Sequence, residues 1–84
     1  MSSEYKASAK ALVRQRLRDP ASAEFTDVRV IPGRPGGTVV CGRVNARTGF
    51  GGMAGPHRFI VGRSVMLEDE IGAALMNDLW ATSC

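Results

Sequence analysis

The sequence predicts an α+β fold, with an N-terminal helix, a three- to four-stranded antiparallel sheet and a C-terminal helix packed on one sheet face. Two observations lead to this prediction. Apolar residues recur at helical spacing near both ends of the chain, whereas in the middle they alternate or cluster in short runs that glycine and proline separate. No strand–helix–strand repeat interrupts those runs, so neighbouring strands are expected to pair as hairpins. The 84 residues are expected to form a single domain, 1–84.

The first helix is predicted over residues 3–18. Its apolar stripe consists of Tyr5, Ala9, Leu12, Val13 and Leu17. Asp19 and Pro20 end the helix, because the residue before a proline disfavours the helical backbone region. Asp19 is then expected to cap a short turn that begins at Pro20.

Short apolar runs between turn residues predict the strands of the sheet. They cover residues 25–31, 38–46 and 57–61, with a short edge strand over 65–67. The proline- and glycine-rich residues 32–37 predict the turn between the first two strands. Residues 47–56 form a glycine-rich loop that, at about ten residues, is longer than an ordinary hairpin turn.

The second helix is predicted over residues 68–81. Its first turn contains Glu68, Asp69 and Glu70, whose negative charge suits the amino end of a helix. Its apolar stripe consists of Ile71, Leu75, Met76, Leu79 and Trp80. Both helices are expected on the same face of the sheet.

The net charge of +3 is unevenly distributed along the chain. Residues 35–66 contain four arginines and no acid, whereas residues 67–84 contain four acids and no base. The basic middle segment is suited to an acidic partner or to a phosphate backbone. The simpler interpretation, and the favoured one, is a solvated surface that faces an acidic C-terminal helix.

Four short motifs, spread over most of the chain, form a combined pattern. They are Asp19-Pro20-x-Ser22-Ala23-x-Phe25, Val40-Cys41-Gly42-x-Val44-Asn45-Ala46, Gly49-Phe50-Gly51-Gly52 and Trp80-x-x-x-Cys84. The pattern resembles that of a group of small uncharacterised bacterial and phage domains, many of which follow export or lipoprotein signals. The resemblance implies a fold and a compartment rather than an activity. A short version without a leader suits a phage-encoded accessory protein that acts inside its host.

Cys41 and Cys84 are the two cysteines of the chain. The resemblance to exported domains favours a disulfide between them, which would join the end of the second helix to a central strand. In a reducing cytosol both thiols would instead stay free, with Cys41 as a small buried side chain.

Phe50 and Met53 are the apolar residues of the glycine-rich loop that most need an explanation. In one interpretation they fold back onto the sheet as a lid. In the other they project as apolar anchors that Arg47 and Arg58 surround, a composition typical of interface hot spots. The second interpretation makes Arg47, Phe50, Met53 and Arg58 the candidate partner-binding residues.

No catalytic, cofactor or metal site is expected. Gly49-x-Gly51-x-x-Ala54 matches part of a dinucleotide fingerprint, but a strand rather than a helix is predicted after it. The single histidine, His57, has no close-spaced ligand partner. No serine lies in a glycine-flanked nucleophile motif, so the chain is not expected to be an enzyme.

The function expected from the sequence is that of a small non-catalytic protein-binding module, such as a phage-encoded inhibitor or adaptor that acts on a host protein. The alternatives are a nucleic-acid-binding protein that uses the basic middle segment and an exported envelope-associated structural domain. A homodimer is a further option for the exposed sheet edge. The N-terminal residues include no apolar signal-peptide core and no membrane span is expected, so a cytoplasmic location is predicted for the sequence as it stands. If a leader has been removed, the location is the periplasm or envelope.

Overall fold

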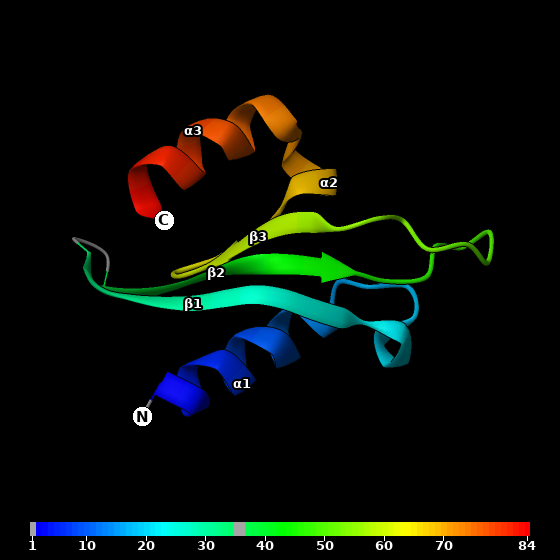
Figure 1. Cartoon of the computed structure of the whole chain (residues 1–84), viewed down its shortest axis with the longest axis horizontal. Coiled ribbons are helices and arrows are strands. Elements are labelled where there is room, and N and C mark those ends of the chain that lie inside the picture. Colours follow the sequence, from blue (N-terminus) through cyan, green and yellow to red (C-terminus); the bar gives the residue numbers. More distant parts are fainter. Residues whose placement is uncertain (1, 35–36) are drawn as a thin grey trace.

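The computed structural model describes residues 2–34 and 37–84 and confirms the α+β class. A four-stranded antiparallel sheet lies between one helix at the N-terminus and two at the C-terminus (Figure 1). The elements follow in the order α1 (Ser2–Arg14), a 3₁₀ turn η1 (Pro20–Ser22), β1 (Glu24–Arg34), β2 (Gly37–Asn45), β3 (His57–Val61), β4 (Val65–Leu67), α2 (Glu68–Ile71) and α3 (Ala73–Ser83).

The sheet is a meander in which the strands lie side by side in chain order, with β1 and β4 at its edges. The first two strands reach further than expected: Arg34 pairs with Gly37, so strand pairing extends into the segment predicted as a turn. Pro32 is tolerated within β1 because an edge strand has one side that pairs with no neighbour. The centre of the predicted turn, residues 35–36, lies outside the described residues.

One face of the sheet packs against α1. Ala9 and Val13 of that helix are buried against Val44 of β2 and Phe59 of β3. The rings of Phe25 and Phe59 meet edge to face, with centroids 5.8 Å apart. This cluster is the larger part of the core.

The other face packs against the C-terminal helices. Met76 of α3 is buried against Cys41 and Ile60, whose side chains alternate with those that face α1. The expectation that both helices share one face is therefore wrong: Figure 1 shows α1 and α3 on opposite sides of the sheet. The missed signal is the uninterrupted apolar runs 39–41 and 59–61, which are typical of strands covered on both faces.

β1 contains a bulge at Asp27. Thr26 pairs with Arg43 and Arg29 pairs with Cys41, so two residues of β1 oppose one residue of β2. Asp27 adopts a φ of 55°, a left-handed conformation that aspartate tolerates better than most residues. Bulges twist an edge strand and disturb its ladder of hydrogen bonds, so β1 is a poor template for adding another strand.

Both helices differ from the predicted ones: the first ends earlier, and the second is divided in two. α1 ends at Arg14 because Arg16 N donates to Val13 O at 2.9 Å and Leu17 N donates to Arg14 O at 3.1 Å, the tighter pattern of a 3₁₀ turn. The second helix is divided into α2 and α3 at Gly72, whose φ of 93° favours glycine.

Candidate functional site

The glycine-rich loop (residues 47–56) extends the β2–β3 hairpin beyond the end of the sheet (Figure 1). Its backbone is hydrogen-bonded across its width: Thr48 N donates to Gly52 O at 2.7 Å, and Ala54 N donates to Ala46 O at 2.9 Å. Arg47 and Met53 form an isolated antiparallel bridge between these two bonds. The loop is therefore a narrow, ordered projection with most of its length in solvent.

Phe50 lies at the turn of this projection. Its exposed fraction is 102% of the reference value, and Met53 is 45% exposed. Phe50 N donates to Thr48 Oγ1 at 3.2 Å, which fixes the backbone that presents the ring. Phe50 does not fold back onto the sheet, so the lid considered in the sequence analysis is not formed.

The base of the loop is tied to the turn η1. Ser22 Oγ donates to Asp19 O at 2.7 Å and accepts from Arg47 N at 2.8 Å, so one hydroxyl joins two distant segments. Asp19 is the N-cap of η1, as predicted, but its side chain makes no capping bond; its Oδ2 lies 3.7 Å from Arg47 Nε. Asn45 Oδ1 accepts from Gly55 N at 2.9 Å on the other side of the loop.

A cleft of about 520 Å³ opens between the end of α1 and the base of the loop. Its apolar wall includes Leu17, Val44 and Leu67, which are also part of the core under α1. Its polar wall consists of Arg16, Arg18, Arg47, Thr48, His57 and Asp69, and Phe50 also lines it. Sequence reasoning missed this cleft because its walls come from four segments that only the folded topology brings together.

The arginines of the cleft differ in how fully they are paired. Arg16 Nη1 binds Glu70 Oε1 at 2.6 Å, whereas Arg47 Nε lies 3.7 Å from Asp19 Oδ2, a longer and weaker contact. Among the residues that the structure describes, Arg18 has no ion-pair partner. Its side chain instead lies over Gly49, where an added Cβ would be only 3.2 Å from Arg18 Cδ.

Arg58 is not part of this arrangement. Side chains alternate along β3, so His57 faces the cleft while Arg58 lies on the face that α3 covers. Its guanidinium binds Glu68, and the whole side chain is only 18% exposed. The structure thus keeps three of the four candidate residues, Arg47, Phe50 and Met53, in one loop and separates Arg58 from them.

Hydrogen bonds from Arg58 also change the acidity of Glu68. The Arg58 side chain and then its backbone N–H donate to the carboxylate, which lowers the pKa of Glu68 from 4.5 to about 2 despite an opposing effect of partial burial. The same contact raises the pKa of Arg58. The first acidic residue of α2 is therefore a structural ion-pair partner.

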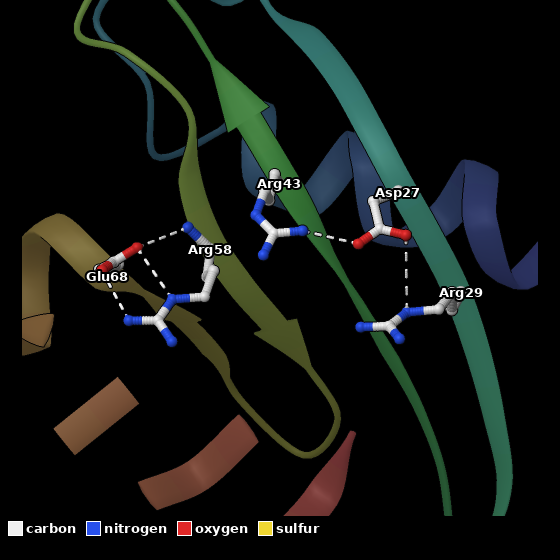
Figure 2. A network of polar contacts seen from close by, with 5 residues as sticks. All are labelled: Asp27, Arg29, Arg43, Arg58 and Glu68. Carbon is white, nitrogen blue, oxygen red and sulfur yellow. Dashed lines mark hydrogen bonds and ion pairs between the residues drawn. The ribbon is translucent and has the colours of Figure 1, made fainter. Parts of the chain in front are cut away.

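Figure 2 shows the pair of Arg58 and Glu68 beside a second polar group, on β1 and β2, that consists of Asp27, Arg29 and Arg43. Asp27 Oδ2 accepts from Arg43 Nη1 at 2.6 Å, and Asp27 Oδ1 lies 3.9 Å from Arg29 Nε. The guanidinium carbons of Arg29, Arg43 and Arg58 lie 5.2, 4.8 and 5.6 Å from the centre of the Trp80 ring.

The cluster of Arg29, Arg43, Arg58 and Trp80 joins α3 to the sheet by cation–π contacts. Arg43 and Arg58 are directly opposed across β2 and β3, a repulsive placement that their acidic partners and Trp80 offset. The indole Nε1 of Trp80 is buried without a hydrogen-bond partner in the described part of the chain. Sequence reasoning did not identify the cluster, because its strand arginines look like ordinary solvent-facing residues until α3 is placed.

Cys41 and Cys84 are joined by a disulfide, with Cα atoms 6.2 Å apart. The bond ties the last residue of the chain to the centre of β2, beside buried Met76 and Ile60. Over residues 2–34 and 37–84, no group of three or more His, Cys, Asp and Glu side chains is arranged to hold a metal ion.

Comparison of the chain with protein-family models, curated proteins and solved structures gives no match of any of the three kinds. The resemblance to small bacterial and phage domains therefore stays a prediction. None of the helices in the described ranges is both long and apolar enough to cross a bilayer.

Proposed function

We propose that this chain is a small non-catalytic protein-binding module that contacts its partner through the glycine-rich loop. The observation that carries the proposal is the complete exposure of Phe50 on a hydrogen-bonded loop. Burying apolar surface stabilises a complex by about 25 cal/mol per Å², and a phenylalanine ring is among the larger apolar groups. A ring held in water by an ordered backbone is therefore ready to bury that surface against another molecule.

The neighbours of Phe50 support the same conclusion. Met53 adds a flexible apolar side chain that adapts to an irregular surface, and Arg47 adds a guanidinium beside it. Backbone bonds within the loop mean that little conformational entropy is lost on binding, which favours affinity. The combination resembles the composition of interface hot spots.

The loop is a better candidate surface than the long sheet edge. The bulge at Asp27 and the proline at position 32 interrupt the hydrogen-bonding row of β1, and β4 has only three residues. These three features oppose pairing with an added strand or a second copy. The expected partner is a host protein, on which the chain acts as an inhibitor or adaptor.

Capture from host lysate tests this proposal. The tagged wild-type chain and two variants, Phe50→Asp and Leu75→Asp, are incubated with lysate before and after nuclease treatment. Leu75 is the matched control because it is 49% exposed on α3, on the opposite side of the sheet from α1. A protein retained in stoichiometric amounts by the wild type and by Leu75→Asp, and lost from Phe50→Asp, supports the proposal.

Two outcomes would contradict it. Retention of the same protein by Phe50→Asp would remove the loop from the interface. Retention only of material that nuclease releases would favour nucleic-acid binding, and steep weakening with salt would then be expected.

A second candidate, an exported envelope-associated structural domain, is favoured by the disulfide between Cys41 and Cys84. Disulfides persist mainly in oxidising compartments. Counting reactive thiols on the unfolded protein from its native source tests this candidate: no free thiol is expected, and two would contradict it.

A further inference from the structure

The side chains that line the cleft beside the glycine-rich loop include more cations than anions. Three arginines line it, against one carboxylate, Asp69. Two of these guanidiniums have capacity for another anion: Arg47 is 3.7 Å from its only acidic neighbour, and Arg18 has none within ion-pair distance in the described residues. Each of these two guanidiniums can bind a carboxylate of an incoming ligand, and bidentate arginine–carboxylate bonds are among the stronger hydrogen bonds.

The inner wall of the cleft is apolar. The side of the cleft nearest the core is formed by Leu17, Val44 and Leu67. Phe50 also lines the cleft. Its volume of about 520 Å³ is within the range of small-ligand pockets. Such a space accommodates an apolar side chain together with part of the backbone that carries it.

Arg18 is positioned for this role by Gly49. The aliphatic part and guanidinium of Arg18 lie where a side chain at position 49 would otherwise be, with Cδ 3.2 Å and Nη1 3.4 Å from an added Cβ. The absence of a side chain at Gly49 therefore lets the unpaired cation lie against the base of the loop. This contact gives Gly49 a role that differs from that of Gly52, which faces open space.

The shape and charge of the cleft favour a peptide over a nucleic acid. A single-stranded nucleic acid is bound by successive aromatic rings and a continuous basic track. Here the aromatic rings are Phe50 and the imidazole of His57, and the inner wall is aliphatic rather than a row of stacking rings.

We infer that the cleft binds an acidic segment of the partner protein, with one apolar side chain inserted against Leu17, Val44 and Leu67 and its carboxylates bound by Arg18 and Arg47. This inference rests on the proposed function, since it names the chemistry of the partner at the same loop. Phe50 contributes contact area, and the arginines select the charge of the segment.

Selection from a random-peptide display library tests the inference. Peptides selected on the wild-type chain are sequenced, synthesised and titrated against the variants Arg18→Glu, Phe50→Asp, Gly49→Ala, Gly52→Ala and Arg63→Glu. Arg63 is the matched charge control, because it is an exposed arginine in the β3–β4 turn, does not line the cleft, and has no ion-pair partner among the described residues. Oligodeoxythymidine is titrated in parallel as the nucleic-acid probe.

The expected peptides are rich in Asp and Glu around one apolar residue. Arg18→Glu should weaken their binding by about tenfold or more, while Arg63→Glu leaves it nearly unchanged. Gly49→Ala, which only displaces Arg18, should give a smaller loss, and Gly52→Ala none.

Three results overturn the inference. Peptides that need Phe50 but are not acidic, or that bind Arg18→Glu as well as wild type, leave the proposed function intact and remove the acidic segment. Failure to select any peptide that Phe50→Asp weakens removes both. Tighter binding of oligodeoxythymidine than of the selected peptides, lost in Arg18→Glu, replaces the peptide with a nucleic acid.

Discussion

Arg58 and Glu68 form a bidentate ion pair, and a hydrogen bond from the backbone N–H of Arg58 strengthens it. Arg58 Nη2 donates to Glu68 Oε2 at 2.8 Å and Arg58 Nε to Oε1 at 3.3 Å, while Arg58 N donates to Oε1 at 2.8 Å. Both side chains are only 18% exposed. The pair fixes the start of α2 against β3, and it explains why the pKa of Glu68 falls to about 2.

This pair predicts a loss of stability in acid. Glu68 has a lower pKa in the folded chain than in the unfolded chain, so its contribution is complete above about pH 4.5 and is lost as the pH falls towards about 2. Urea unfolding from pH 6 to pH 2 should show a steeper decline for the wild type than for Glu68→Gln. Parallel pH profiles for the two proteins would contradict the predicted role of the pair.

Gly42 is predicted to reject any side chain. An added Cβ would lie 2.8 Å from Phe59 Cζ and 3.1 Å from Val28 Cγ2, and the phenylalanine ring is fully buried and cannot move away. Gly42→Ala should lower the free energy of unfolding by about 1–3 kcal/mol. Gly52→Ala, whose Cβ meets nothing within 4 Å, is the control. Equal urea midpoints for the two variants would show that Phe59 is less tightly held than described.

The disulfide is predicted to stabilise the chain substantially. It closes a loop with a sequence separation of 43, and such cross-links typically contribute about 2–4 kcal/mol. Urea unfolding with and without a reductant should show this difference in the wild type, and Cys84→Ser should match the reduced wild type. An unfolding midpoint that is insensitive to reductant would contradict the prediction.

Trp80 is predicted to hold α3 on the sheet. It packs in the core cluster of Met76 and receives three guanidiniums on its ring. Trp80→Ala should lower the free energy of unfolding by about 3 kcal/mol, through lost packing and unstacked arginines. Leu75→Ala, on the exposed side of α3, should change it by less than about 0.5 kcal/mol. Similar losses from both would mean that Trp80 has no special part in docking the helix.

Local signals were enough to predict most of the elements. The strands over 57–61 and 65–67 have the predicted bounds, because the tight turn at Gly62 and Ser64 separates two clear apolar runs. The opposite placement of the helices was not predicted, since an apolar stripe identifies a buried helix face but not which face of the sheet receives it.

The candidate site was predicted only where it is local in sequence. Phe50 and Met53 belong to one loop, for which the sequence left open a lid or an exposed projection, and both side chains are exposed. Arg58 was grouped with them by proximity in sequence, but alternation along β3 directs it to the α3 side, where Glu68 and Trp80 hold it. The cleft and Arg18 depend on contacts across the fold, which no periodicity reveals.

The central claim is that the Phe50 ring serves binding rather than stability, and one comparison tests it most directly. The free energy of unfolding and the affinity for the purified captured partner are measured for the wild type and Phe50→Asp. Because the ring is fully exposed, the substitution should change stability by less than about 0.5 kcal/mol. It should weaken binding by about thirtyfold or more, the effect of losing a hot-spot residue. A large loss of stability with unchanged affinity would contradict the claim and make Phe50 a structural residue.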